Sequence, residues 1–107
     1  MENLIITESK VAGCLLLAVE GTVNLYTSGD FEKKVYSAIK DNDVILDLSK
    51  VGTLSSSGIG VLMTAHNESE ENGHKMYILN PAKDVKMALD STGFSDVFRM
   101  IHSIDEI

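Results

Sequence analysis

The pattern of apolar and polar positions predicts a chain in which strands and helices alternate. Short apolar runs bounded by turn residues indicate strands. Five such runs lie at residues 3–9, 13–21, 41–49, 75–80 and 96–101. Apolar residues spaced three or four apart indicate helices, and this spacing follows the second, third and fourth strands. The predicted order is strand, strand, helix, strand, helix, strand, helix and strand, with a short helix at residues 103–107.

Each of the three main helices has an apolar stripe that is expected to face the core. The stripes are Phe31, Val35, Ala38 and Ile39; Ile59, Leu62, Met63 and His66; and Val85, Ala88 and Leu89. Within the second stripe, Ile59 and Met63 suit either the core or an interface. Gly73 and Gly93 are expected to end the second and third helices, because glycine readily adopts the left-handed conformation found after a helix C-terminus.

Residues that cap helix N-termini precede most of the predicted helices. Thr27 or Ser28 is expected to cap the first helix, Asn80 the third, and Ser103 the short last helix. Pro81 suits the first turn of the third helix, where its missing N–H leaves nothing unpaired.

The connections between strands predict a mixed sheet. The first two strands are separated by residues 10–13, which suit a tight turn and an antiparallel hairpin. The later strands are separated by helices, which implies parallel neighbours joined by right-handed crossovers. The strand at 41–49 carries the almost continuous apolar run 44–48, as expected of a central strand covered on both faces. The predicted fold class is α/β, with a mostly parallel sheet that has an antiparallel edge.

Composition and charge narrow the classes of function. The chain has 107 residues, enough for one domain, which is expected to span residues 1–107. Its formal net charge is −7, which argues against nucleic-acid binding and against docking on anionic membranes. The longest apolar run, residues 14–19, is too short to cross a bilayer, and residues 1–10 lack the pattern of a secretory signal. A cytoplasmic protein with no direct membrane insertion is expected.

The single cysteine and one acidic cluster have simple interpretations. Cys14 cannot form an internal disulfide, and its apolar surroundings in the sequence predict a buried small hydrophobe. Glu68, Glu70 and Glu71 lie near a helix end and are expected to form a solvated surface.

Three consecutive serines and a glycine, residues 55–58, stand between the third strand and the second helix. Any one of the hydroxyls can cap the helix, a contribution of about 1 kcal/mol, but capping leaves the other two unexplained. Open α/β sheets place their sites at such strand-to-helix junctions, and a helix N-terminus favours an anion. A phosphate attached to a serine here would carry about −1.5 to −2 charges, which the local backbone tolerates and a bound partner surface does not.

Other chemistry is weakly indicated. Gly58 and Gly60 match neither common phosphate-loop pattern, and they more simply let the helix approach the sheet. The nucleophile-elbow pattern GxSxG is absent. His66, His74 and His102 form no metal-ligand spacing; His66 is expected to be packed and His74 exposed. No catalytic residue, metal or cofactor is therefore expected.

The stretch "VILDLSKVGTLSSSGIGVLM", residues 44–63, resembles the signature of STAS domains, a family named after sulfate transporters and anti-sigma factor antagonists. In the family pattern an apolar strand leads into Asp-Leu-Ser, and a later apolar residue precedes Asp-Ser-Ser/Thr-Gly and a helix. The matching residues are Asp47, Leu48 and Ser49, then Leu54, Ser56, Ser57 and Gly58. Residues 17–35 resemble the family's strand, Gly-x-x-Asp, Thr and helix, and residues 91–100 resemble its late Thr-Gly-apolar segment.

The resemblance implies a STAS-like mixed sheet with helices packed mainly on one side. In stand-alone bacterial members it also implies partner switching. The unphosphorylated protein binds an anti-sigma factor that is also a serine kinase, and the sigma factor is released. The kinase then phosphorylates the motif serine, the complex separates, and a serine phosphatase resets it. By position, Ser56 is the phosphoacceptor, and Ser57 and Gly58 complete the helix start.

Two positions depart from the family pattern. Ser55 stands where the family usually has an acidic residue, and Asn24 replaces the aspartate of Gly-x-x-Asp. Both changes remove a negative charge beside Ser56, which makes a phosphate easier to tolerate and weakens recognition by a kinase that relies on those carboxylates. Ser55 is also a second candidate acceptor. The expected partner-binding residues are Asn24, Ser55, Ser56, Ser57, Gly58 and Ile59.

Two functions of different class follow from the resemblance. The first is an anti-sigma factor antagonist controlled by reversible phosphorylation of Ser56. The second is a cytoplasmic accessory subunit of a membrane transporter, which would use the same helix face without phosphorylation. The loss of both acidic residues mildly favours the second.

Overall fold

The structure, a computed structural model, describes residues 4–93 and 95–107. The strands are β1 (Leu4–Val11), β2 (Cys14–Val23), β3 (Val44–Leu54), β4 (Met76–Leu79) and β5 (Arg99–Ile101). The helices are α1 (Ser28–Ile39), α2 (Ser56–Glu71) and α3 (Lys83–Ser91), with short 3-10 turns η1 (Ser95–Val97) and η2 (Ile104–Glu106). Residue 3, at which the predicted first strand begins, and Phe94 of the late family segment lie outside the described residues.

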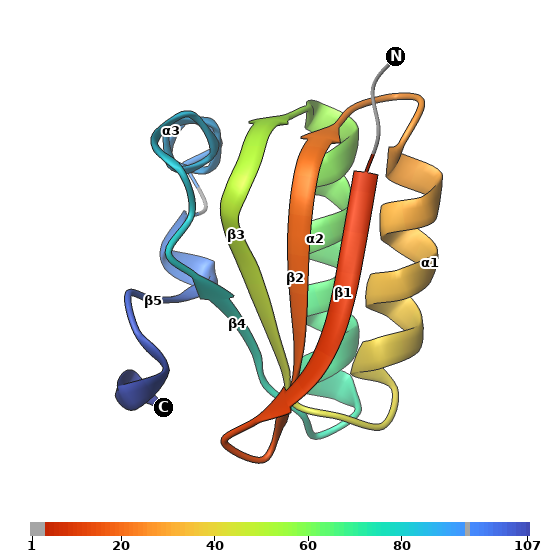
Figure 1. Ribbon diagram of the computed structural model, residues 1–107, viewed down its shortest axis with the longest axis vertical. Coiled ribbons are helices and arrows are strands. Elements are labelled where there is room, and N and C mark those ends of the chain that lie inside the picture. Colours follow the sequence, from red (N-terminus) through yellow and green to blue (C-terminus); the bar gives the residue numbers. More distant parts are fainter. Residues whose placement is uncertain (1–3, 94) are drawn as a thin grey trace.

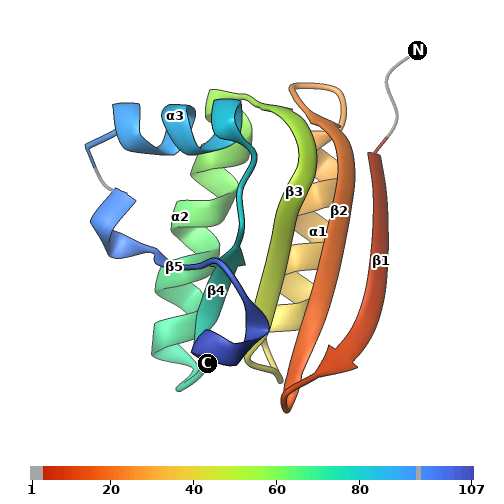
Figure 2. The same ribbon diagram turned by 60° about the vertical axis from the view of Figure 1, so that its left-hand side comes forward.

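The five strands form one mixed sheet in the order β1-β2-β3-β4-β5. β1 and β2 are antiparallel, and the other neighbours are parallel. Helices α1 and α2 lie side by side on one face of the sheet, and α3 lies beyond β3 on the side of β4 and β5 (Figures 1 and 2). The predicted STAS-like mixed sheet is therefore confirmed. Along the described residues no helix combines the length and apolar character needed to cross a membrane.

The core lies between the sheet and the helices, and it contains most of the predicted stripes. All four stripe residues of α1 are buried, as are Leu62 and His66 of α2 and Val85 and Leu89 of α3. They pack with sheet residues such as Leu17, Leu46 and Ile78. Ile59, Met63 and Ala88 are half-buried, and the first two pack at the border of the core. The stripes are amphipathic because only one side of each helix faces the sheet.

Two of the predicted caps are wrong. Thr27 stands at the N-cap of α1, but its hydroxyl makes no capping bond. Helix α3 begins at Lys83 after Ala82, and not at Pro81 after Asn80. The reason is that the backbone still follows the sheet there: Asn80 N donates to Ile101 O at 2.7 Å and Ala82 N to Leu48 O at 3.3 Å.

Other predicted helix ends agree with the structure. Gly73 and Gly93 both have φ of +77° just after α2 and α3, as expected of glycines that end helices. Ser103 caps η2, and its hydroxyl forms a reciprocal capping box with Glu106. The last strand, β5, is shorter than the predicted strand at residues 96–101. Residues 95–97 form a 3-10 turn, and pairing with β4 begins only at Arg99.

Strand β3 extends five residues beyond its predicted end, to Leu54. A bulge accommodates one additional residue, since Ala18 pairs with Asp47 whereas Glu20 pairs with Lys50. Within the bulge, Ser49 donates from its N and its Oγ to Asp47 Oδ1, at 3.0 and 2.7 Å. Residues 50–54 lay outside the predicted strand, but pairing with β2 keeps them extended. This extension carries the chain directly to the three serines.

Candidate functional site

The candidate site lies where β2 and β3 end together. Their last paired residues are Val23 and Leu54, and Ser55 N donates to Val23 O at 2.9 Å. The loop from β2 to α1 and the first turn of α2 therefore leave the sheet at the same edge (Figure 1). Carboxyl ends of neighbouring parallel strands are where α/β sheets place their sites.

Gly58 seats the start of α2 on this edge. A Cβ at Gly58 would lie 2.6 Å from Leu54 Cδ1 and 2.7 Å from Val23 Cγ1, closer than real side chains approach. The predicted close approach of helix and sheet is therefore confirmed at Gly58. It is wrong for Gly60, where a Cβ would meet nothing within 4 Å.

The three serine hydroxyls have different surroundings. Ser55 is the N-cap of α2, and its Oγ accepts from Gly58 N at 3.4 Å. The same oxygen lies 2.7 Å from Ser57 Oγ, so these two half-buried hydroxyls bond to each other. Ser56 is exposed, and its hydroxyl makes no hydrogen bond within the described part of the chain. The cap and the bond between Ser55 and Ser57 thus occupy these two hydroxyls, and Ser56 stays accessible at the first position of the helix.

Asn24 shapes the neighbouring loop. Its Oδ1 accepts from the backbone N of Tyr26 at 2.8 Å and of Thr27 at 3.1 Å. Asn24 N in turn donates to Thr27 Oγ1 at 2.9 Å, and that hydroxyl donates to Thr22 O at 2.7 Å. An aspartate oxygen could accept the same two backbone bonds, and asparagine makes them without a negative charge.

The sequence patterns predicted no role for two residues of this loop. Leu25 has 78% of its surface exposed and Tyr26 has 89%. The signal that could have revealed them is the placement of two large apolar residues between Asn24 and Thr27, in a segment with no helical or strand periodicity. Ile59, one turn into α2, is half-buried at the same edge.

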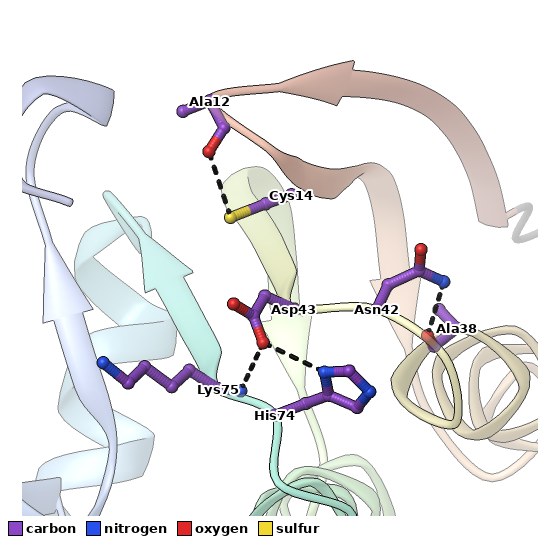
Figure 3. A network of polar contacts seen from close by, with 7 residues as sticks. All are labelled: Ala12, Cys14, Ala38, Asn42, Asp43, His74 and Lys75. Carbon is purple, nitrogen blue, oxygen red and sulfur yellow. Dashed lines mark hydrogen bonds and ion pairs between the residues drawn. The ribbon is translucent and has the colours of Figure 1, made fainter.

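A second cluster of polar side chains lies at the opposite end of β3 (Figure 3). Asp43 Oδ1 accepts from Lys75 N at 2.9 Å and lies 3.2 Å from His74 Nδ1. Asp43 and Ser55 lie just beyond the two ends of β3, so this cluster belongs to a different part of the molecule. It ties the turn after α2 to the start of β3, and the predicted exposure of His74 is reduced by this contact to 29% of its side chain.

Cys14 begins β2 at this same end, and only 5% of its surface is exposed. Burial, and secondarily the charge of Asp43, raises the pKa of its thiol. The thiol therefore stays protonated at neutral pH, as expected of the small buried hydrophobe that the sequence predicted.

His66 and Glu70 connect α2 to the C-terminal strand. His66 is buried with its ring edge-on to Phe98, 5.9 Å between centroids, which confirms that it is a packed residue. Glu70 Oε1 accepts from Arg99 Nη1 at 2.5 Å, and this hydrogen bond lowers the pKa of Glu70. One member of the acidic cluster is thus an anchor for β5. Among residues 4–93 and 95–107, no three His, Cys, Asp or Glu side chains are placed to hold a metal.

The sequence and the fold agree on the family. Residues 6–107 match the STAS domain family, and the chain belongs to it. The fold is similar to an anti-sigma factor antagonist from Mycobacterium paratuberculosis, with a TM-score of 0.86 and 17% identity over 97% of this chain and 90% of that one.

Two further solved structures resemble this chain. The anti-sigma factor antagonist SpoIIAA in its unphosphorylated form has a TM-score of 0.77 and 16% identity, covering 95% of this chain and 92% of that one. The Bacillus cell fate determinant SpoIIAA in its phosphorylated form has a TM-score of 0.71 and 15% identity, covering 95% and 96%. At these identities the likeness concerns the fold.

Proposed function

We propose that this protein is an anti-sigma factor antagonist that acts by partner switching in the cytoplasm, with Ser56 as its phosphoacceptor. The observation that carries the proposal is the exposed Ser56 hydroxyl, free of hydrogen bonds within the described chain, at the first position of α2. A kinase can reach this hydroxyl without unfolding the domain. Solved relatives known in unphosphorylated and phosphorylated forms support the proposal.

The geometry favours Ser56 over Ser55 as the acceptor. Ser55 Oγ is half-buried, caps Gly58 N and bonds to Ser57 Oγ, so its modification would break the helix start. A phosphate on Ser56 would instead lie near the free N–H groups and the positive end of the α2 dipole. The fold is expected to keep its structure when Ser56 is modified.

The switch would act at the interface with the partner, an anti-sigma factor that is also a serine kinase. A phosphate brings about −1.5 to −2 charges into a surface that the complex covers. Leaving a charge buried and unpaired typically costs about 3–5 kcal/mol, and each 1.4 kcal/mol weakens binding about tenfold. Asn24, Ser57, Gly58 and Ile59 would contribute the rest of the contact, and a serine phosphatase would restore binding.

The test is capture of partners from the native cytoplasm by wild-type protein, Ser56→Asp and Ser37→Asp. Ser37 is exposed on α1 and receives the same change of charge away from the site. We expect an ATP-binding serine kinase to be captured by wild type and Ser37→Asp but not by Ser56→Asp. Mass spectrometry after incubation with that kinase and ATP should place the phosphate on Ser56. Equal capture of the kinase by all three proteins would contradict the proposal.

The second candidate function is an accessory subunit of a membrane transporter. Ser55 and Asn24 stand in place of two acidic residues, and Asn24 maintains its loop without a charge. Such a subunit would bind through the same face with no need for phosphorylation. Capture of transporter subunits by both wild type and Ser56→Asp would support this function.

A further inference from the structure

The β2–α1 loop presents two large apolar side chains to solvent beside the serines. Leu25 and Tyr26 are 78% and 89% exposed. The other two tyrosines, Tyr36 and Tyr77, are half-buried. Single exposed apolar residues are ordinary on protein surfaces, but an adjacent pair next to a candidate site is not.

The loop holds this pair outward in a defined conformation. Asn24 Oδ1 bonds to the N of Tyr26 and of Thr27, at 2.8 and 3.1 Å, and Ser28 N donates to Asn24 O at 2.8 Å. Thr27 Oγ1, itself buried, donates to Thr22 O at 2.7 Å and ties the loop to the end of β2. A preorganised loop loses little conformational entropy on binding, so the apolar surface of Leu25 and Tyr26 contributes more fully to affinity.

The loop that carries the pair leaves the sheet next to Ser55. Val23, two residues before Leu25, accepts a hydrogen bond from Ser55 N at 2.9 Å and underlies Gly58. The loop and the start of α2 therefore lie at the same end of the sheet (Figure 1). A partner that covers Ser56 would reach the loop as well.

We infer that Leu25 and Tyr26 are the apolar anchors by which this protein docks on its partner kinase. The inference rests on the proposed function and adds the chemistry of the partner: an apolar pocket next to the kinase's phosphate-transfer site. Tyrosine is enriched among residues that dominate binding energy, which suits Tyr26 to this role.

The negative charge of this chain favours a kinase over a second copy of the chain as the molecule that covers Leu25 and Tyr26. The chain carries a net charge of −7. At the start of α1, just after the loop, Asp30 and Glu32 are exposed and are followed by the exposed Lys33. Two copies, each with a net charge of −7, would repel one another, whereas a basic partner surface would be complementary. The pocket is therefore expected to have a basic rim.

The test uses the purified serine kinase captured by the wild-type protein. Its affinity is measured for wild type, Leu25→Ser, Tyr26→Ser, the double variant and Ile107→Ser. Ile107 is the matched control, since it is 44% exposed at the C-terminus, which lies at the other end of the sheet (Figure 1). We expect Kd to rise roughly 30-fold for Tyr26→Ser and by more for the double variant, mostly through faster dissociation, with Ile107→Ser unchanged.

Phosphorylation kinetics provide a second readout. The Tyr26→Ser variant should raise KM for phosphorylation of Ser56 and leave kcat near the wild-type value, because Tyr26 binds the kinase without touching the reacting hydroxyl. Circular dichroism should show the fold of each variant unchanged.

Four results would overturn the inference. If the kinase phosphorylates Ser56 while the loop variants bind it like wild type, Leu25 and Tyr26 are not docking residues, although the proposed function stands. A lower kcat with unchanged KM would place Tyr26 in the reaction and not in docking. If the loop variants instead abolish self-association measured by sedimentation, the loop is a dimer interface. If no kinase binds wild type, the proposed function fails, and the inference fails with it.

Discussion

Ser55 Oγ and Ser57 Oγ lie 2.7 Å apart and bond to each other across the first turn of α2. This pairing uses two of three consecutive hydroxyls and leaves the middle one, Ser56, exposed without a hydrogen bond among the described residues. The three serines therefore combine a structural cap with an accessible hydroxyl.

Ser55→Ala should lower the free energy of unfolding by about 1 kcal/mol, because it removes the cap of α2. Ser56→Ala should change it by less than about 0.5 kcal/mol, as is usual for exposed positions. Urea denaturation followed by circular dichroism measures both. A larger loss in Ser56→Ala than in Ser55→Ala would show that the cap is assigned to the wrong serine.

Gly58→Ala should destabilise the domain by roughly 1–3 kcal/mol, because the new methyl group meets Leu54 and Val23 beneath the helix. Gly60→Ala is the matched control on the same helix. Its Cβ would face open space, so replacing a helical glycine should stabilise by roughly 0.5–1 kcal/mol. Thermal denaturation of the two variants should shift Tm in opposite directions, and shifts of the same sign would contradict the close approach.

Asn24→Asp should retain the stability of the wild type, because a carboxylate oxygen can accept the backbone bonds of Tyr26 and Thr27. Asn24→Ala should lose roughly 1–2 kcal/mol, since those bonds are lost. Amide hydrogen exchange at Tyr26 and Thr27 should accelerate only in the alanine variant. Unchanged exchange in Asn24→Ala would mean that the side chain does not hold the loop.

Glu70 should contribute stability that depends on pH. The Arg99 hydrogen bond lowers its pKa in the folded state, so the unfolded state binds the proton more tightly. The contribution is therefore present above the pKa of an unperturbed glutamate and is lost as pH falls through the lowered folded value. Urea midpoints measured between pH 3 and pH 7 should show a smaller acid loss in Glu70→Gln than in wild type. The same pH dependence in both proteins would exclude Glu70 as a source of it.

Cys14 should be unreactive towards thiol reagents in the folded protein at neutral pH. Its burial and raised pKa keep the thiolate population low. Labelling with a maleimide should be slow without denaturant and fast in urea, when the thiol is exposed. Rapid labelling of the folded protein would show that the start of β2 opens readily.

Much of the fold could be predicted from local patterns. The stripe from Phe31 to Ile39 and the apolar run from Val44 identified a helix and a central strand, because burial on one face or on both leaves a period in the sequence. The errors lie where distant pairing overrides local preference. Asn80 resembled a cap but pairs its N–H with Ile101, and residues 50–54 lay outside the predicted strand but pair with β2.

Residue types and their spacing along the chain are enough to identify the STAS family, the order of the main elements and the position of the three serines. The sequence left open which of the three serines caps the helix, and it assigned no role to Leu25 and Tyr26. The pairing of Ser55 with Ser57, the exposure of Ser56 and the start of the Leu25–Tyr26 loop next to Ser55 appear only in the folded chain. The reason is that exposure and pairing depend on how the ends of β2 and β3 meet, and that contact joins residues some thirty positions apart in the chain.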